Sequence, residues 1–135
     1  MKKLSLLYVF VLFVFSYSAF ALKASTITTP APQSPAYQQY LKRPKNEMSK
    51  LLYLMDRFKQ APLTVIYDRV EYESDIALKH AKSYVAKHYQ RQNAAEWIQE
   101  NAYRSLHGSV IYVKFPDGEK RVLRDVLIEE LNHLV

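Results

Sequence analysis

The distribution of proline divides this chain into two parts. Four of its six prolines lie in one short stretch, at Pro30, Pro32, Pro35 and Pro44. Each proline fixes its own φ angle and lacks a backbone donor, so neither a helix nor a strand is expected to run through this stretch. We therefore predict a disordered linker rich in proline, serine and threonine over residues 22–45, and one folded domain over residues 46–135.

The N-terminal sequence MKKLSLLYVFVLFVFSYSAFA has the order of a signal peptide. Lys2 and Lys3 form a basic start, an apolar core follows, and Ala19-Phe20-Ala21 supplies the small side chains that a signal peptidase needs. We predict a signal peptide over residues 1–21, cleavage after Ala21 and a periplasmic destination, so that the chain meets the membrane only transiently. The alternative is an uncleaved anchor, because residues 4–22 carry no charge and are just long enough to span a bilayer.

The composition limits the chemistry that this chain can perform. It has 135 residues, of which 49% are hydrophobic and 24% charged, as expected for one small folded domain. It contains no cysteine, which excludes disulfides, thiolate zinc sites, cysteine nucleophiles and lipid attachment to an N-terminal cysteine. The formal net charge of +6 falls to +4 without Lys2 and Lys3, which is too small to imply nucleic-acid binding.

Hydrophobic periodicity after residue 46 predicts a small α+β domain. Apolar residues recur every three or four positions from Met48 to Phe58, which is typical of an amphipathic helix. Two strand-like runs then flank Asp68-Arg69 as a β-hairpin, with Val70 and Tyr72 facing inward. The expected order is helix, β-hairpin, helix, helix, strand and helix with a short antiparallel sheet, at residues 48–58, 63–73, 75–91, 93–107, 110–115 and 123–134.

Several stretches between Glu47 and Leu134 resemble the YfeK-like family of small exported bacterial proteins. EMSKLLYLM resembles the opening helix of that family, ALKHAKSYVAKHY a later helix, and LRDVLIEEL the last one. The resemblance implies a fold and a compartment, but no activity. One departure concerns the Arg-Asn-Gly turn of the family, which here reads Tyr67-Asp68-Arg69, without the glycine. A site at that turn in the family would therefore be altered in this chain.

The stretch RSLHG brings Ser105, His107 and Gly108 close together in sequence. A nucleophilic serine needs a base within hydrogen-bond reach, yet side chains two positions apart on a helix point away from each other. We therefore predict no catalytic residue here. Ser105 is expected to pack beside Trp97 and Ile98, and His107 with Gly108 to end the third helix.

Two further polar residues interrupt the apolar faces of the predicted helices. Asn101 lies on the inner face of the third helix, where a buried amide needs a hydrogen-bond partner in a neighbouring strand or loop. His88 lies on the inner face of the second helix and is expected in the core.

The most favoured function is a non-enzymatic interaction module of the cell envelope, whose partner is another envelope protein. Tyrosines near basic residues suit a binding surface, because they bring contact area at low entropy cost. The predicted interaction surface consists of Tyr53, Lys79, Lys82, Lys87 and Tyr103.

Two alternatives remain open from the sequence. One is a hydrolase or another small-ligand enzyme with its site near the predicted hairpin, at Tyr67, Asp68, Arg69, Glu71 and His80. The other is a binder of anionic lipid or polysaccharide, through Lys79, Lys82 and Lys87. No cofactor, metal or nucleic acid is expected in any of these interpretations.

Overall fold

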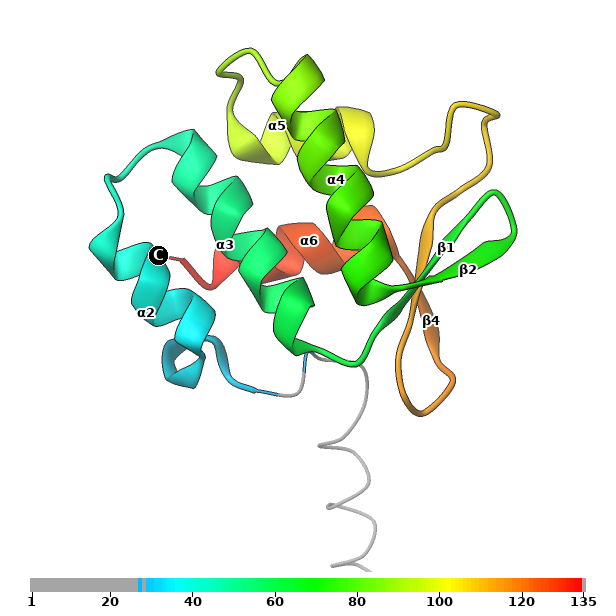
Figure 1. The fold of residues 1–135 in the computed structure, drawn as a ribbon, viewed down its shortest axis with the longest axis horizontal. Coiled ribbons are helices and arrows are strands. Elements are labelled where there is room, and N and C mark those ends of the chain that lie inside the picture. Colours follow the sequence, from blue (N-terminus) through cyan, green and yellow to red (C-terminus); the bar gives the residue numbers. More distant parts are fainter. Residues whose placement is uncertain (1–26, 28, 135) are drawn as a thin grey trace, which may run out of the picture.

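The computed structural model describes residue 27 and residues 29–134, so the predicted signal peptide lies outside the described residues. The described chain forms a small α+β domain, which confirms the predicted fold class (Figure 1). Its elements are η1 (Ala31–Gln33), α2 (Pro35–Lys42), α3 (Glu47–Gln60), β1 (Thr64–Tyr67), β2 (Val70–Glu73), α4 (Ser74–His88), α5 (Ala94–Asn101), β3 (Tyr112–Lys114), β4 (Lys120–Val122) and α6 (Leu123–Asn132).

The four strands form one antiparallel sheet in the order β2-β1-β3-β4. Val65 of β1 lies at its centre, opposite Tyr72 of β2 and Val113 of β3. The sequence predicted β1, β2 and β3 but missed β4, which pairs with β3 across a turn closed by Gly118 at φ 89°. The predicted inward position of Val70 is wrong, because 50% of this residue is exposed at the start of the edge strand β2.

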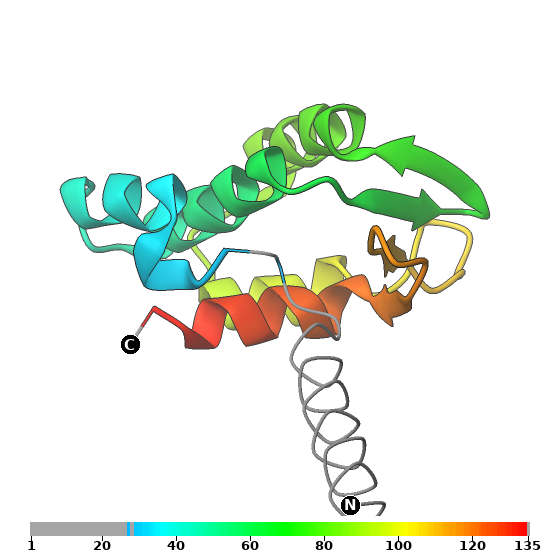
Figure 2. The same cartoon turned by 90° about the horizontal axis from the view of Figure 1, so that it is seen from below.

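The two halves of the chain form two layers, which Figure 2 shows edge-on. The first half supplies α2, α3, α4 and the β1–β2 hairpin to one layer, and the second half supplies α5, α6 and the β3–β4 hairpin to the other (Figure 2). Pairing between β1 and β3 joins the layers at the sheet, and contacts from α3 to α5 and α6 join them elsewhere.

The predicted linker is wrong for the residues that form α2. Ser34 caps this helix by accepting a hydrogen bond from the Tyr37 backbone N–H, and Pro35 occupies the first turn, where its missing donor costs nothing. Ala36 and Tyr40 are buried, and the Tyr40 ring lies 5.8 Å from that of Tyr53. The domain therefore begins before residue 46, and the linker prediction failed because proline is compatible with the start of a helix.

A buried ion pair joins the two layers at α3 and α6. The Arg57 guanidinium donates two hydrogen bonds to the Glu130 carboxylate, at 2.9 and 3.2 Å, and both side chains are less than a tenth exposed. Tyr53 donates a further hydrogen bond to the same carboxylate at 3.3 Å. Burial, together with the Glu130 charge, raises the pKa of Tyr53 to about 12. The predicted surface position of Tyr53 is therefore wrong, because its hydroxyl is paired inside the domain.

We expect the Arg57–Glu130 pair to be the most costly interaction to break by a single substitution. Glu130→Ala leaves the guanidinium buried without a counter-charge, which should lower the free energy of unfolding by about 3–5 kcal/mol. The matched control is Glu129→Ala, one position away, where the carboxylate is 44% exposed beside Arg121 and the expected loss is at most about 1 kcal/mol. Urea titrations of both variants measure the difference, and similar losses would contradict this interpretation of the pair.

We also expect the segment before residue 46 to contribute to stability. A chain that starts at Asn46 loses the buried side chains of Ala36 and Tyr40, and should unfold with a free energy lower by at least about 2 kcal/mol than a chain that starts at Leu22. Thermal and urea unfolding of the two chains give this difference. Equal stabilities would restore the linker prediction.

Candidate functional site

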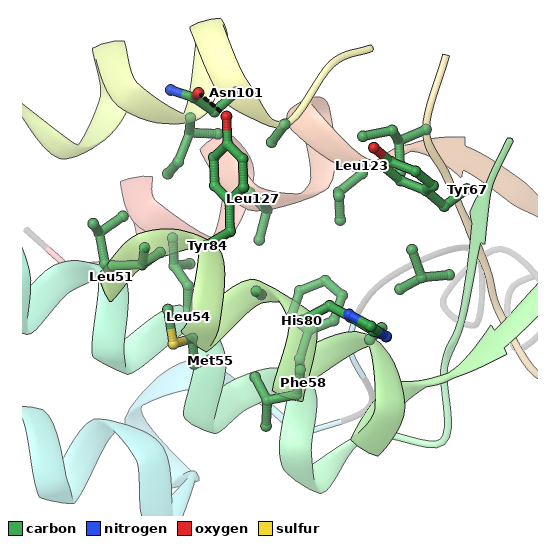
Figure 3. A pocket seen from close by; sticks show the side chains of 18 of the residues that line it. Leu51, Leu54, Met55, Phe58, Tyr67, His80, Tyr84, Asn101, Leu123 and Leu127 are labelled. Carbon is green, nitrogen blue, oxygen red and sulfur yellow. Dashed lines mark hydrogen bonds between the residues drawn. The ribbon is translucent and has the colours of Figure 1, made fainter. Parts of the chain in front are cut away.

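A cavity of about 460 Å³ lies between the two layers. Its apolar floor comes from α3 and α6, and Figure 3 shows these side chains pointing into one space. The residues of this floor are Leu51, Leu54, Met55, Phe58, Leu123 and Leu127. Trp97 and Ile98 of α5 and Val65 of β1 close its sides. The cavity is therefore formed by parts of both halves of the chain, and it opens to solvent where His80, Ala81 and Arg104 are exposed.

Helix α4 forms one wall of the cavity with both small and large side chains. Only Leu78 and Val85 are buried on this helix, whereas Ala77 and Ala81 line the cavity without filling it. The inner face predicted for this helix is therefore only partly packed. His88 is exposed, contrary to the predicted core position, and its ring stacks against Tyr84 at 4.4 Å between ring centroids.

A hydrogen bond between α4 and α5 closes one side of the cavity. The Tyr84 hydroxyl donates to Asn101 Oδ1 at 3.1 Å, and Asn101 Nδ2 donates to the Trp97 carbonyl at 2.9 Å (Figure 3). The Asn101 amide is thus satisfied on both sides, as expected, but its partners lie on helices rather than in a strand or loop. The Tyr84 and Trp97 rings lie 5.9 Å apart, so a polar bond and an aromatic contact hold the same two helices together.

Two of the enzyme-site candidates line the cavity and three do not. Tyr67 and His80 contribute to its wall, whereas Asp68, Arg69 and Glu71 lie outside it. The His80 ring contacts Tyr72 edge-on at 6.2 Å, and neither of its nitrogens forms a hydrogen bond with a described residue. His80 therefore offers a polar group to any molecule that enters.

The described residues of the cavity wall carry a positive formal charge but no negative one. Among the described residues that form it, none is Asp or Glu, and Arg104 supplies a formal positive charge. One nitrogen of Arg104 donates to the Gly108 carbonyl at 2.8 Å, and the guanidinium lies 4.9 Å from the centre of the Tyr103 ring. A wall with a cation and no carboxylate favours a neutral or anionic occupant over a cationic one.

Ser105 binds the turn of the β1–β2 hairpin rather than α5. That helix ends at Asn101, earlier than predicted, and Ser105 lies in the loop that follows. Its hydroxyl donates to Asp68 and accepts from the backbone N–H groups of His107 and Ser109, each at 3.2 Å. These contacts replace the predicted packing beside α5 as the reason for its burial.

The arrangement around Asp68 does not have the geometry of a catalytic triad. A triad places the histidine between the serine and the carboxylate, so that the imidazole can accept the serine proton. Here Asp68 itself accepts from Ser105, and His107 Nε2 lies 3.9 Å from the other carboxylate oxygen. The His107 side chain is 83% exposed. We interpret this group as a latch between the loop and the hairpin turn.

The remaining residues of the predicted interaction surface do not form one patch at the cavity. Lys79, Lys82 and Lys87 are exposed on α4 and do not line it. Tyr103 is half-buried, with the guanidinium of Arg124 over its ring at 4.0 Å. Within the described part of the chain, no group of three or more acidic or histidine side chains could hold a metal ion. No described helix is long and apolar enough to span a membrane.

Comparisons with known proteins add no family to this description. No protein-family model matches the chain, and neither a curated protein nor a solved structure does. The resemblance to the YfeK-like family therefore stays a prediction from the sequence.

We expect Ser105 to contribute to stability through its three hydrogen bonds. Ser105→Ala leaves Asp68 and two backbone N–H groups without this partner, and should lower the free energy of unfolding by about 1–3 kcal/mol. His107→Ala is the matched control, since its side chain is exposed and the expected loss is below about 0.5 kcal/mol. Urea unfolding measures both, and equal small losses would show that the latch does not hold the loop.

Proposed function

We propose that this protein is an exported, non-enzymatic binding protein of the cell envelope, whose cavity holds a small amphipathic molecule. The observation that carries the proposal is the apolar cavity of about 460 Å³ between the two layers. This volume falls within the range of about 300–1,000 Å³ that is typical of small-molecule sites. Such sites are mostly apolar with a few polar groups, which matches this wall.

The chemistry of the wall suggests the class of ligand. An apolar body would cover the side chains of α3 and α6, which is the main source of binding free energy in such a site. A polar head would meet His80, whose nitrogens have no partner among the described residues, or the part of Arg104 that does not bind Gly108. The absence of Asp and Glu from the described wall favours a neutral or anionic head.

The same wall gives little support to the enzyme alternative. General acid–base or nucleophilic catalysis needs two or more groups in mutual reach, one of which positions the other. His80 contacts the ring of Tyr72 edge-on, and Ser105 is engaged by Asp68 outside the cavity. The sequence-based proposal of an envelope protein as partner remains compatible with the cavity, which would then receive an apolar side chain of that partner.

The proposal predicts that one substitution on α4 closes the site. Ala81→Trp places a large ring at the exposed edge of the cavity wall, so the protein should fold but bind 1-anilinonaphthalene-8-sulfonate at least about tenfold more weakly. Ala86→Trp is the matched control, because Ala86 is exposed on the same helix and does not line the cavity. Fluorescence titration measures both affinities. Equal affinities of the two variants would contradict the proposal.

Two ligands with alkyl chains of the same length then test which head group the cavity prefers. Decanoate should displace the dye at a concentration about fivefold lower than decyltrimethylammonium, because Arg104 attracts the first and repels the second. The reverse order would show that the positive charge of the wall does not select the ligand.

A further inference from the structure

Two exposed apolar residues lie near each other at one end of the molecule. Leu106 is 88% exposed in the loop after α5, and Val70 is 50% exposed at the turn between β1 and β2. The Leu106 backbone N–H donates to the Tyr67 hydroxyl at 3.3 Å, and Tyr67 pairs with Val70 across the hairpin. Figures 1 and 2 both show this loop beside the hairpin. We call Val70, Leu106 and the cations around them the apolar tip.

The loop that carries Leu106 is held in place on both sides of this residue. Ser105 binds Asp68 of the hairpin turn, and its backbone N–H donates to the Ser109 carbonyl at 2.8 Å. Arg104 donates to the Gly108 carbonyl and pairs with Val110 as an isolated β-bridge. These bonds fix the backbone around Leu106, which is 88% exposed at the edge of the cavity. Its exposure is therefore a consequence of the local structure.

The charges around the tip are mainly positive. Arg69 and Arg104 are exposed, and Arg69 forms no ion pair within residues 29–134. The side chain of His107 is also exposed. The carboxylate of Asp68 is only 26% exposed and faces Ser105 and His107, while Glu71 is paired with Lys114 at 3.3 Å. Arg69 and Arg104 thus supply two formal positive charges against the one carboxylate of Asp68, because Glu71 is paired with Lys114.

We propose that the apolar tip docks on an anionic lipid bilayer. Exposed apolar side chains flanked by arginines can enter the headgroup region, while the cations contact anionic lipids. A stable protein interface buries about 800 Å² on each partner, which two side chains of this size cannot supply. The charge and the small apolar area therefore favour a lipid surface over a protein partner.

Docking at this tip would also bring the cavity to the bilayer. Leu106, Arg104 and Tyr67 contribute both to the tip region and to the cavity wall. An amphipathic molecule could then pass between the lipid surface and the cavity without crossing water. This last step rests on the proposed function, whereas the docking itself does not.

Vesicle flotation tests the docking with the chain from Leu22, which contains every described residue. The probes are vesicles of phosphatidylcholine alone and vesicles that also contain phosphatidylglycerol. We expect binding to the anionic vesicles, weakened by added salt, and much weaker binding to the neutral ones. Failure to bind the anionic vesicles, or equal binding to both kinds, would overturn the proposal.

Single substitutions locate the surface that binds. Leu106→Ser should weaken vesicle binding about tenfold, and Arg69→Gln about fivefold. Leu41→Ser is the matched control, because Leu41 is 51% exposed on α2, at the opposite end of the molecule from the hairpin (Figure 1). Equal affinities of Leu106→Ser and Leu41→Ser would overturn the proposal.

A further pair of variants separates docking from cavity binding. Val70→Thr keeps the shape of the side chain but makes it more polar, so vesicle binding should weaken about threefold. Because Val70 does not line the cavity, the affinity for the dye should stay unchanged. Ala81→Trp should lose dye binding and keep vesicle binding. If Ala81→Trp removes vesicle binding and Val70→Thr does not weaken it, the tip is not the docking surface. Loss of dye binding in Val70→Thr would likewise overturn the separation of the two surfaces.

Discussion

The buried ion pair between Arg57 and Glu130 constrains the arrangement of the two layers. Two charges removed from water are tolerated only when they meet each other in good geometry, and the two-pronged contact of the guanidinium provides that geometry. Tyr53 fills a remaining acceptor position on the carboxylate and carries the rings of α2 on its other side. The pair therefore fixes how α3 lies on α6, and α2 follows through Tyr53. The cavity floor is built from the same two helices, so its shape depends on this contact.

The ion pair and the cavity differ in how closely the side chains pack between the layers. Where α3 meets α6 at the pair, the side chains satisfy one another, and the contact is specific. Where α4 covers the layers, alanines leave space that their neighbours do not fill. This space opens to solvent, because His80, Ala81 and Arg104 on its wall are exposed. The hydrogen bond from Tyr84 to Asn101 joins α4 to α5 beside this space.

The sequence predicted those elements whose own residues carry a hydrophobic periodicity or a turn motif. The periodicity of α3, the hairpin around Asp68-Arg69 and the helix α6 are local features, and the α+β class follows from their order. Strand β4 was missed because Lys120 and Arg121 show no strand pattern, and its conformation comes from pairing with β3. Tyr53 was misplaced because the partner of its hydroxyl lies 77 residues further along the chain. Tyr67 and His80 both line the cavity, but the cavity requires four helices to meet and has no signature in any one segment.

The division of the chain into two layers also determines the order in which contacts form during folding. Helices α2, α3 and α4 and the first hairpin can form from neighbouring residues, before the second half of the chain is in place. The partner of Arg57, however, lies on the last helix, 73 residues later. Contacts of such long sequence separation form late, because the chain must first lose the entropy of the loop between them. Until α6 is in place, the chain thus has an unpaired arginine and an open apolar layer, so the first layer alone is expected to remain loosely structured.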